Sequence, residues 1–323
     1  MKNILYLVVP CYNEEEVLPE TSRRLSLKLD SLTQAGKISP QSRVLLVDDG
    51  SKDRTWELIS GLHETDPRFE GLRLSRNRGH QNALLAGLMT ARSFADMTIS
   101  LDADLQDDVN AIDAMVDHYL NGSDIVYGVR SSRRTDTAFK RGTAQTYYKL
   151  LRLLGADLVY DHADFRLMSR RALDALAQFG EVNLFLRGIV PMLGFRTSIV
   201  EYQRAERFAG ESKYPLKKML EFAAEGITSL TTRPLRFILF GGIALAGLSL
   251  LLLLIFAIAA CFGNGFPIAR LLLCAILFVG GVNLTALGVV GEYVGKIYLE
   301  TKHRPSFLID QFLHSDDRDC EHE

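Results

Sequence analysis

Short apolar runs alternate with amphipathic stretches from the start of the chain to Tyr127. The apolar runs are typical of buried parallel strands and cover residues 4–9, 43–47, 72–75, 97–101 and 124–127. Helical periodicity between them predicts helices over residues 14–32, 55–63, 81–91 and 109–120. This order predicts an α/β fold, with a mostly parallel, Rossmann-like sheet covered by helices on both faces.

Two longer apolar runs, residues 237–262 and 271–291, carry no charged side chain. Each is long enough, as a helix, to cross a hydrocarbon core of about 30 Å. A pair of buried core helices is the alternative, but soluble core helices rarely run this far without charge. Because the linker 263–270 is short, we expect an antiparallel transmembrane hairpin over residues 234–298. Glycines in both spans permit close packing, and so a homo-oligomer, without requiring one.

Positive charges flank this hairpin on its outer sides, and the linker carries only Arg270. The flanking residues are Arg233, Arg236, Lys296, Lys302 and Arg304. The positive-inside rule therefore predicts a multi-pass protein of the cytoplasmic (inner) membrane, with residues 1–214 and the tail 299–323 in the cytoplasm. The tail after Pro305 is polar and acidic at its end, so we expect it to be mobile.

Residues 215–233, just before the hairpin, mix apolar positions with Lys217 and Lys218. This pattern predicts an amphipathic helix at the membrane interface. A helix packed on the catalytic domain is the alternative.

Composition narrows the function classes. The net charge of −2 argues against a protein built to bind nucleic acid. The four cysteines show no paired spacing, which argues against a zinc site and a disulfide scaffold. The polar clusters that could carry chemistry follow the predicted strands, where parallel sheets bind ligands.

Asp102 and Asp104 come directly after the strand at 97–101. Two carboxylates so placed can share Mg²⁺ or Mn²⁺ and leave positions open for phosphate oxygens. Gln106 could add an amide oxygen, and we expect Asp107 and Asp108 to begin the next helix. A solvated acidic turn is the alternative interpretation.

Two further clusters suit a nucleotide. Asp49 ends the second strand and could accept a hydrogen bond from a base, although it could also cap a turn. Tyr12 and Glu14, after the first strand, offer a ring face and an acceptor, or simply a helix start.

As a set, the segments 9–14 (VPCYNE), 47–51 (VDDGS) and 102–106 (DADLQ) resemble family 2 glycosyltransferases with the GT-A fold. The segments 164–169 (DFRLMS), 207–214 (RFAGESKY) and 291–295 (GEYVG) narrow the resemblance. They are similar to polyprenyl-phosphate glycosyltransferases, a group that includes dolichol-phosphate-mannose synthases and bactoprenol glucosyltransferases. The resemblance covers residue 4 to about residue 310.

The resemblance implies roles for particular residues. The base and ribose site would be lined by Pro10, Tyr12, Glu14, Val47 and Asp49. The metal and diphosphate would be held by Asp102, Ala103, Asp104 and Gln106. Arg130 would face the diphosphate or the sugar, and Arg207 and Lys213 would bind the acceptor phosphate. Asp102, Asp104, Arg130, Arg207 and Lys213 would thus form the catalytic set.

The implied reaction is metal-dependent, inverting transfer of a hexose to undecaprenyl phosphate. A lipid phosphate is already an anion, so it needs cations beside it rather than a general base. The resemblance favours UDP-glucose as donor and leaves GDP-mannose, UDP-galactose and an amino sugar open. A nucleotide-sensing membrane receptor and a processive synthase are rival classes. A synthase would carry a QxxRW segment, which the chain lacks.

Overall fold

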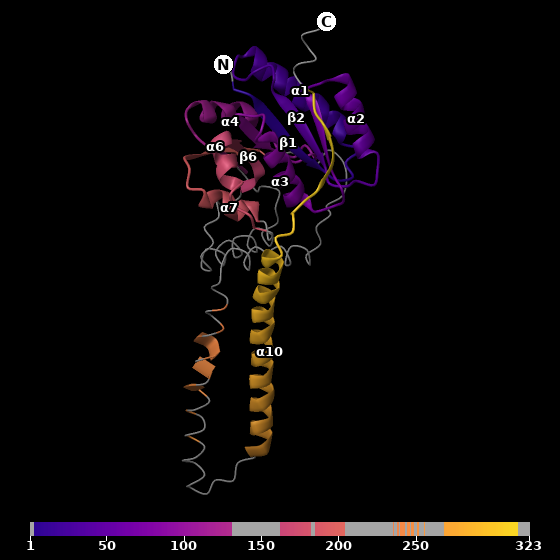
Figure 1. Ribbon diagram of the computed structural model, residues 1–323. Helices are drawn as coiled ribbons and strands as arrows, with labels where there is room; N and C mark the ends of the chain where they lie inside the picture. Colours follow the sequence, from indigo (N-terminus) through magenta and orange to yellow (C-terminus); the bar gives the residue numbers. More distant parts are fainter. Residues whose placement is uncertain are drawn as a thin grey trace.

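The computed structural model describes residues 3–130, 162–181, 185–203 and 268–315, with isolated positions between 235 and 255. A sheet flanked by helices forms one end of the molecule, and the long helix α10 extends away from it (Figure 1). The predicted interfacial helix at 215–233 lies outside the described residues.

Eight strands form a single sheet in the order β7-β5-β6-β4-β1-β2-β3-β8. The strands are β1 (Leu5–Cys11), β2 (Arg43–Asp48), β3 (Phe69–Leu74), β4 (Met97–Ser100), β5 (Ile125–Arg130), β6 (His162–Ser169), β7 (Thr197–Tyr202) and β8 (Ile309–Leu313). Strand β1 runs parallel to β2 and β4, β2 to β3, and β5 to β7. Strand β6 lies antiparallel between β4 and β5, and β8 antiparallel to β3. The predicted mostly parallel α/β sheet is confirmed.

Helices cover both faces of this sheet because side chains alternate along each strand. On one face, Leu5, Leu7 and Val9 pack with helices α1 (Leu18–Gln34), α2 (Thr55–Thr65) and α4 (Ala111–Leu120). On the other, Tyr6 and Val8 pack with α3 (His80–Ala91), α6 (Arg170–Leu176) and α7 (Leu186–Met192). The two apolar layers hold the strand ends, and therefore the loops that follow them, in fixed positions.

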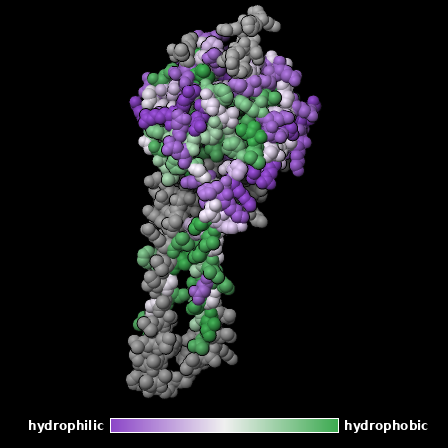
Figure 2. Space-filling model, in the orientation of Figure 1, coloured by the Kyte–Doolittle hydropathy of each residue, from purple (hydrophilic) through white to green (hydrophobic). Residues whose placement is uncertain are grey.

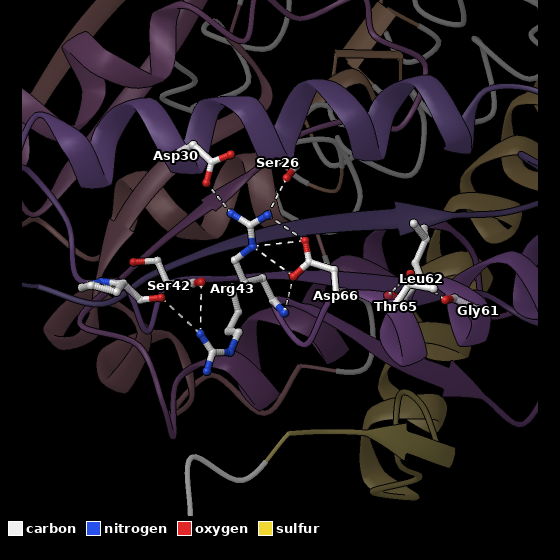
Figure 3. A network of polar contacts seen from close by, with 10 residues as sticks. Ser26, Asp30, Ser42, Arg43, Gly61, Leu62, Thr65 and Asp66 are labelled. Carbon is white, nitrogen blue, oxygen red and sulfur yellow. Dashed lines mark hydrogen bonds and ion pairs between the residues drawn. The ribbon is translucent and has the colours of Figure 1, made fainter. Parts of the chain in front are cut away.

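Ion pairs tie the helices together at the edge where the parallel strands begin. Arg68, just before β3, donates hydrogen bonds to Asp66, to Asp30 and to Ser26 of α1 (Figure 3). Arg43, at the start of β2, donates to the backbone oxygen of Ser42. The Arg68 ion pairs are partly exposed and contribute modestly to stability. The candidate site lies at the opposite edge, where the parallel strands end.

Several predictions about the ends of elements were wrong. Helix α1 begins at Leu18 rather than at residue 14. The described part of the stretch after Pro305 is not a mobile tail, because residues 309–313 form strand β8. Apolar residues begin and end this strand, and Phe312 packs against the core of the sheet.

Helix α10 (Ile268–Thr301) includes the predicted second span at 271–291 and continues ten residues beyond it. Its 34 residues make it about 50 Å long. Large apolar side chains are exposed along it, visible as a green surface in Figure 2; they include Leu272, Ile276, Phe278, Leu284 and Leu287. By length and composition, one helix of the described part could cross a membrane, Phe278–Thr301. The first span at 237–262 is described only at isolated positions, so the hairpin stays a prediction.

After α10 the chain returns to the sheet. The backbone N–H of Ser75, directly after β3, donates to the Leu308 oxygen at 2.9 Å. Ile309 then pairs with Leu74, the last residue of β3. The chain from the end of α10 therefore joins the sheet at the carboxyl ends of its parallel strands, within about 25 Å of Thr301.

Candidate active site

The predicted site residues that the structure describes meet at one edge of the sheet. Strands β1, β2, β4, β5 and β7 all end there, so their last residues, Cys11, Asp48, Ser100, Arg130 and Tyr202, lie along this edge. Strand β6 runs the opposite way and brings Asp164 to the same edge from its amino-terminal part. Ligands of open parallel sheets bind at this edge.

The loop after β4 presents alternate side chains to solvent. Asp102, Asp104 and Gln106 are half-buried, whereas Ala103, Leu105 and Asp107 are buried. Thr21 of α1 donates a hydrogen bond to the Ala103 oxygen at 2.8 Å. Leu105 adopts a left-handed conformation with φ of 57°. This turn places the three oxygen-bearing side chains on the accessible side of the loop.

Asp102 lies in a cluster of carboxylates. Burial raises the pKa of Asp102 above its usual range, and the charges of Asp164 and Asp104 raise it further, although His80 opposes them. The repulsion would be relieved by a cation, and carboxylate and amide oxygens suit Mg²⁺ or Mn²⁺. The donor set therefore fits a divalent metal.

Within the described ranges, no three acidic, histidine or cysteine side chains are grouped as a metal site. A metal at Asp102 and Asp104 would take its other ligands from phosphate oxygens or water, as Mg²⁺ commonly does.

Three side chains missed by the sequence analysis surround Asp102. His80, at the start of α3, lies with Nε2 3.6 Å from Asp102 Oδ1 and 3.4 Å from Asp164 Oδ2. Arg187 of α7 donates two hydrogen bonds to the Asp164 carboxylate, at 3.1 and 2.9 Å. Burial alone would raise the pKa of Asp164, but Arg187 and His80 outweigh it and hold the pKa well below its usual value. The segment 164–169 had carried the family resemblance, which was the one available signal for Asp164.

The predicted Arg130 ends β5. Burial lowers the pKa of its guanidinium, but Tyr202, Asp107 and Asp102 together raise that pKa above its usual value. Its Nε donates to the Tyr202 hydroxyl at 3.3 Å. That hydroxyl donates to Asp107 Oδ1 at 2.5 Å. The expectation that Asp107 begins a helix was wrong, because α4 starts at Ala111 and the Asp107 side chain is 3% exposed. Burial and the charge of Asp102 raise the pKa of Asp107 to about 6.

On the nucleotide side, Asp49 holds a neighbouring loop. Its carboxylate accepts the backbone N–H groups of Arg78 at 2.6 Å and Gly79 at 2.9 Å. Arg78 is therefore held in position through its backbone N–H. Gly50, with φ of +66°, lies so close that a Cβ there would be 2.7 Å from the Asn77 nitrogen. An ionised carboxylate has about four acceptor sites, so Asp49 can still accept a hydrogen bond from a ligand.

The remaining predicted nucleotide residues differ in accessibility. Pro10 and Val47 are register partners on β1 and β2, and both are buried. Tyr12 is 37% exposed at the site edge, and the Glu14 backbone N–H donates to Thr55. Ligand contacts of these residues stay predictions. Arg207 and Lys213 lie outside the described residues.

Comparison with known proteins gives one family. The profile of glycosyl transferase family 2 matches residues 6–177. A relative from Bacillus subtilis (strain 168), named an uncharacterized glycosyltransferase, is 49% identical over 97% of this chain and 93% of its own length. The bactoprenol glucosyl transferase of Shigella phage SfV is 40% identical over 94% of this chain and 97% of its own. A mannosyl-3-phosphoglycerate synthase from Rubrobacter xylanophilus, 16% identical, matches 72% of this chain and 74% of its own, with a TM-score of 0.49.

Proposed function

The chain belongs to glycosyl transferase family 2, and from this premise we propose that it transfers glucose from UDP-glucose to a polyprenyl phosphate at the cytoplasmic face of the membrane. The product would be a lipid-phosphate sugar. A different sugar nucleotide, such as GDP-mannose, UDP-galactose or one with an amino sugar, is the alternative donor.

The acceptor and the sugar are suggested by the phage relative, which is named a bactoprenol glucosyl transferase. The alignment spans almost the whole length of both chains, so it includes the residues of α10 as well as the catalytic sheet. An apolar helix of that length suits an enzyme whose acceptor is a membrane lipid.

The observation that carries the proposal is the position of the site relative to α10. The segment after Thr301 joins the sheet beside Ser75, at the edge that also bears Asp102 and Arg130. A lipid phosphate stays at the headgroup level, so an enzyme acting on it must turn its reacting edge toward the membrane. The junction beside Ser75 supports such an orientation.

The donor half of the site uses residues at the ends of β1, β2 and β4. Tyr12 would stack on the base, and Asp49 would accept from it. Asp102 and Asp104, with Gln106, would hold Mg²⁺ or Mn²⁺ and through it the diphosphate. When bound, such a metal supplies Lewis-acid stabilisation of the charge that develops on the leaving phosphate.

The acceptor half needs positive charge rather than a base. Arg130 is the cation of this set that the structure describes, and it lies beside Asp102. Arg207 and Lys213 would add two more between the sheet and the membrane. These cations would hold the acceptor phosphate next to the donor diphosphate, although the two anions repel each other. Holding the reactants close together would supply much of the remaining rate enhancement.

The test uses the full chain in detergent with labelled UDP-glucose and undecaprenyl phosphate. A charged, organic-soluble labelled lipid is the expected product. Asp104→Asn should remove it, whereas the matched control Asp108→Asn should retain it, because among the described residues the Asp108 side chain accepts one hydrogen bond, from the backbone N–H of Asn110 in its own loop. A product formed from another nucleotide alone would overturn the donor assignment. No transfer to the lipid from any nucleotide would overturn the acceptor assignment.

A further inference from the structure

A row of three polar side chains crosses the active-site edge beside Asp102. Arg130 and Tyr202 are register partners at the ends of the parallel strands β5 and β7. The Tyr202 hydroxyl accepts from Arg130 Nε at 3.3 Å and donates to Asp107 Oδ1 at 2.5 Å. Arg130 Nη2 lies 3.9 Å from the same Asp107 oxygen. One hydroxyl therefore joins the loop after β4 to the last residues of two strands.

The ring of Tyr202 is fixed by packing as well as by hydrogen bonds. Phe165 meets it edge-on, with ring centroids 5.2 Å apart and planes at 90°. Phe165 can approach because β5 has a glycine beside it, where a Cβ at Gly128 would be 2.7 Å from the Phe165 ring. A tyrosine held on its ring and on both sides of its oxygen is a rigid support for whatever it contacts.

That support acts on one side of the guanidinium only. Among the described residues, Arg130 has Tyr202 and Asp107 as its hydrogen-bond and ion-pair partners. A guanidinium carries five N–H donors in a fixed plane, so fixing Nε also fixes the direction of the others. The Arg130 side chain is 29% exposed, so those donors can reach a ligand.

The arrangement has a structural cost. Asp107 is 3% exposed, and its Oδ2 has no hydrogen-bond partner among the described residues. Burying a carboxylate with an unmatched oxygen is unfavourable, and such groups in native structures require an explanation. Holding Tyr202 provides one.

We propose that Tyr202 is a positioning residue: held by Asp107, it fixes the Nε side of Arg130 so that the remaining guanidinium N–H groups face phosphate oxygens beside Asp102. The ligand chemistry is a phosphate oxyanion, from the donor diphosphate or from the acceptor. The inference rests on the proposed function for the identity of these two phosphates.

The test is a double-mutant cycle between Tyr202→Phe and Arg130→Lys in the full-length protein. Tyr202→Phe keeps the ring and its contact with Phe165 and removes the hydroxyl. Arg130→Lys keeps the charge and removes the planar fork. One arm measures the Kd of UDP with Mn²⁺ by calorimetry, and the other measures the KM for undecaprenyl phosphate. Each single variant should raise one of these two constants, the Kd or the KM, about ten- to a hundredfold, as expected for a lost charge-assisted hydrogen bond.

The effects of the two substitutions should not add. In the Arg130→Lys background, Tyr202→Phe should change the affected constant less than threefold. Coupling in the UDP arm would assign Arg130 to the donor, and coupling in the lipid arm to the acceptor. Tyr119→Phe is the matched control, because its hydroxyl contacts the Asp96 backbone away from the site, and it should change neither arm.

Additive losses in both arms, or a Tyr202→Phe protein equal to wild type in both, would overturn the inference. If the variants fold poorly, the thermal midpoint falls, and the Kd of UDP and the KM for undecaprenyl phosphate both rise without coupling. That outcome counts against the inference. A wild-type protein that binds UDP but transfers nothing to the lipid would refute the proposed function, while the UDP arm would still test the role of Tyr202.

Discussion

Replacing Arg187 with alanine should destabilise the catalytic domain through Asp164. The Arg187 guanidinium forms two hydrogen bonds with a carboxylate whose side chain is 8% exposed. After Arg187→Ala, that carboxylate stays buried and keeps the support of His80, whose Nε2 lies 3.4 Å away, and of the charge on the buried Arg166. Breaking one partner of a buried pair costs about 3–5 kcal/mol.

The expected loss of stability lies below that range because the Arg187 side chain is 34% exposed, so water can replace part of its interaction with Asp164. We expect a loss of about 2–3 kcal/mol in the free energy of unfolding. For a domain of this size, that corresponds to a fall of roughly 5–10 °C in the thermal midpoint. Because Asp164 neighbours Asp102, sugar transfer should fall as well.

Thermal unfolding of the purified protein in detergent measures the effect. Arg92→Ala is the matched control, since its ion pair with Asp174 is long, at 3.8 Å, and exposed on both sides, so its loss should cost less than about 0.5 kcal/mol. Adding Asp164→Asn to Arg187→Ala removes the unpaired charge and should recover about 1 kcal/mol. If Arg187→Ala is as mild as the control, or the double variant is worse by the sum of both losses, the reasoning is refuted.

Three further predictions concern separate parts of the molecule. Asp104→Asn should abolish transfer without affecting membrane insertion, and wild-type activity should vanish in EDTA and return with Mg²⁺ or Mn²⁺; full turnover in chelator would contradict the metal assignment. Lys213→Ala should raise the KM for polyprenyl phosphate roughly ten- to a hundredfold, since a charge-assisted contact contributes about 1.5–3 kcal/mol, and a change confined to the KM for UDP-glucose would place Lys213 at the donor instead. Deleting residues 309–323 should lower the free energy of unfolding by about 2 kcal/mol or more, because Phe312 leaves the core and β3 loses its antiparallel partner; an unchanged denaturant midpoint would mean that β8 contributes nothing.

The sequence was sufficient to predict the strands that carry most of the site. Strands β1, β2 and β4 are mainly apolar runs buried on both faces, and this pattern depends only on neighbouring residues. Their ends locate Asp49 and Asp102 without any knowledge of distant contacts. Arg130 was implied by the family resemblance instead, because the predicted strand stopped at Tyr127 whereas β5 continues to Arg130.

The parts that were missed depend on contacts between distant segments. Because Asp107 precedes α4 in the sequence, it was predicted to begin that helix. It becomes a partner of Tyr202 because β7 packs beside β5 in the sheet. His80 becomes a neighbour of Asp164 only because β6 enters the sheet antiparallel, between β4 and β5. No local periodicity encodes either event.

Strand β8 shows how α10 and the catalytic edge are joined. Its short length and polar surroundings resemble a tail, yet His314 lies 2.8 Å from the fully buried Glu70 and packs against Phe94 and Phe312. Burial raises the pKa of Glu70, and His314 opposes that effect. Only residues 302–308 separate the end of α10 from β8, so this linker limits how far the edge that bears Asp102 can lie from α10. The proposed transfer between a dissolved nucleotide and a lipid phosphate would need such a limit.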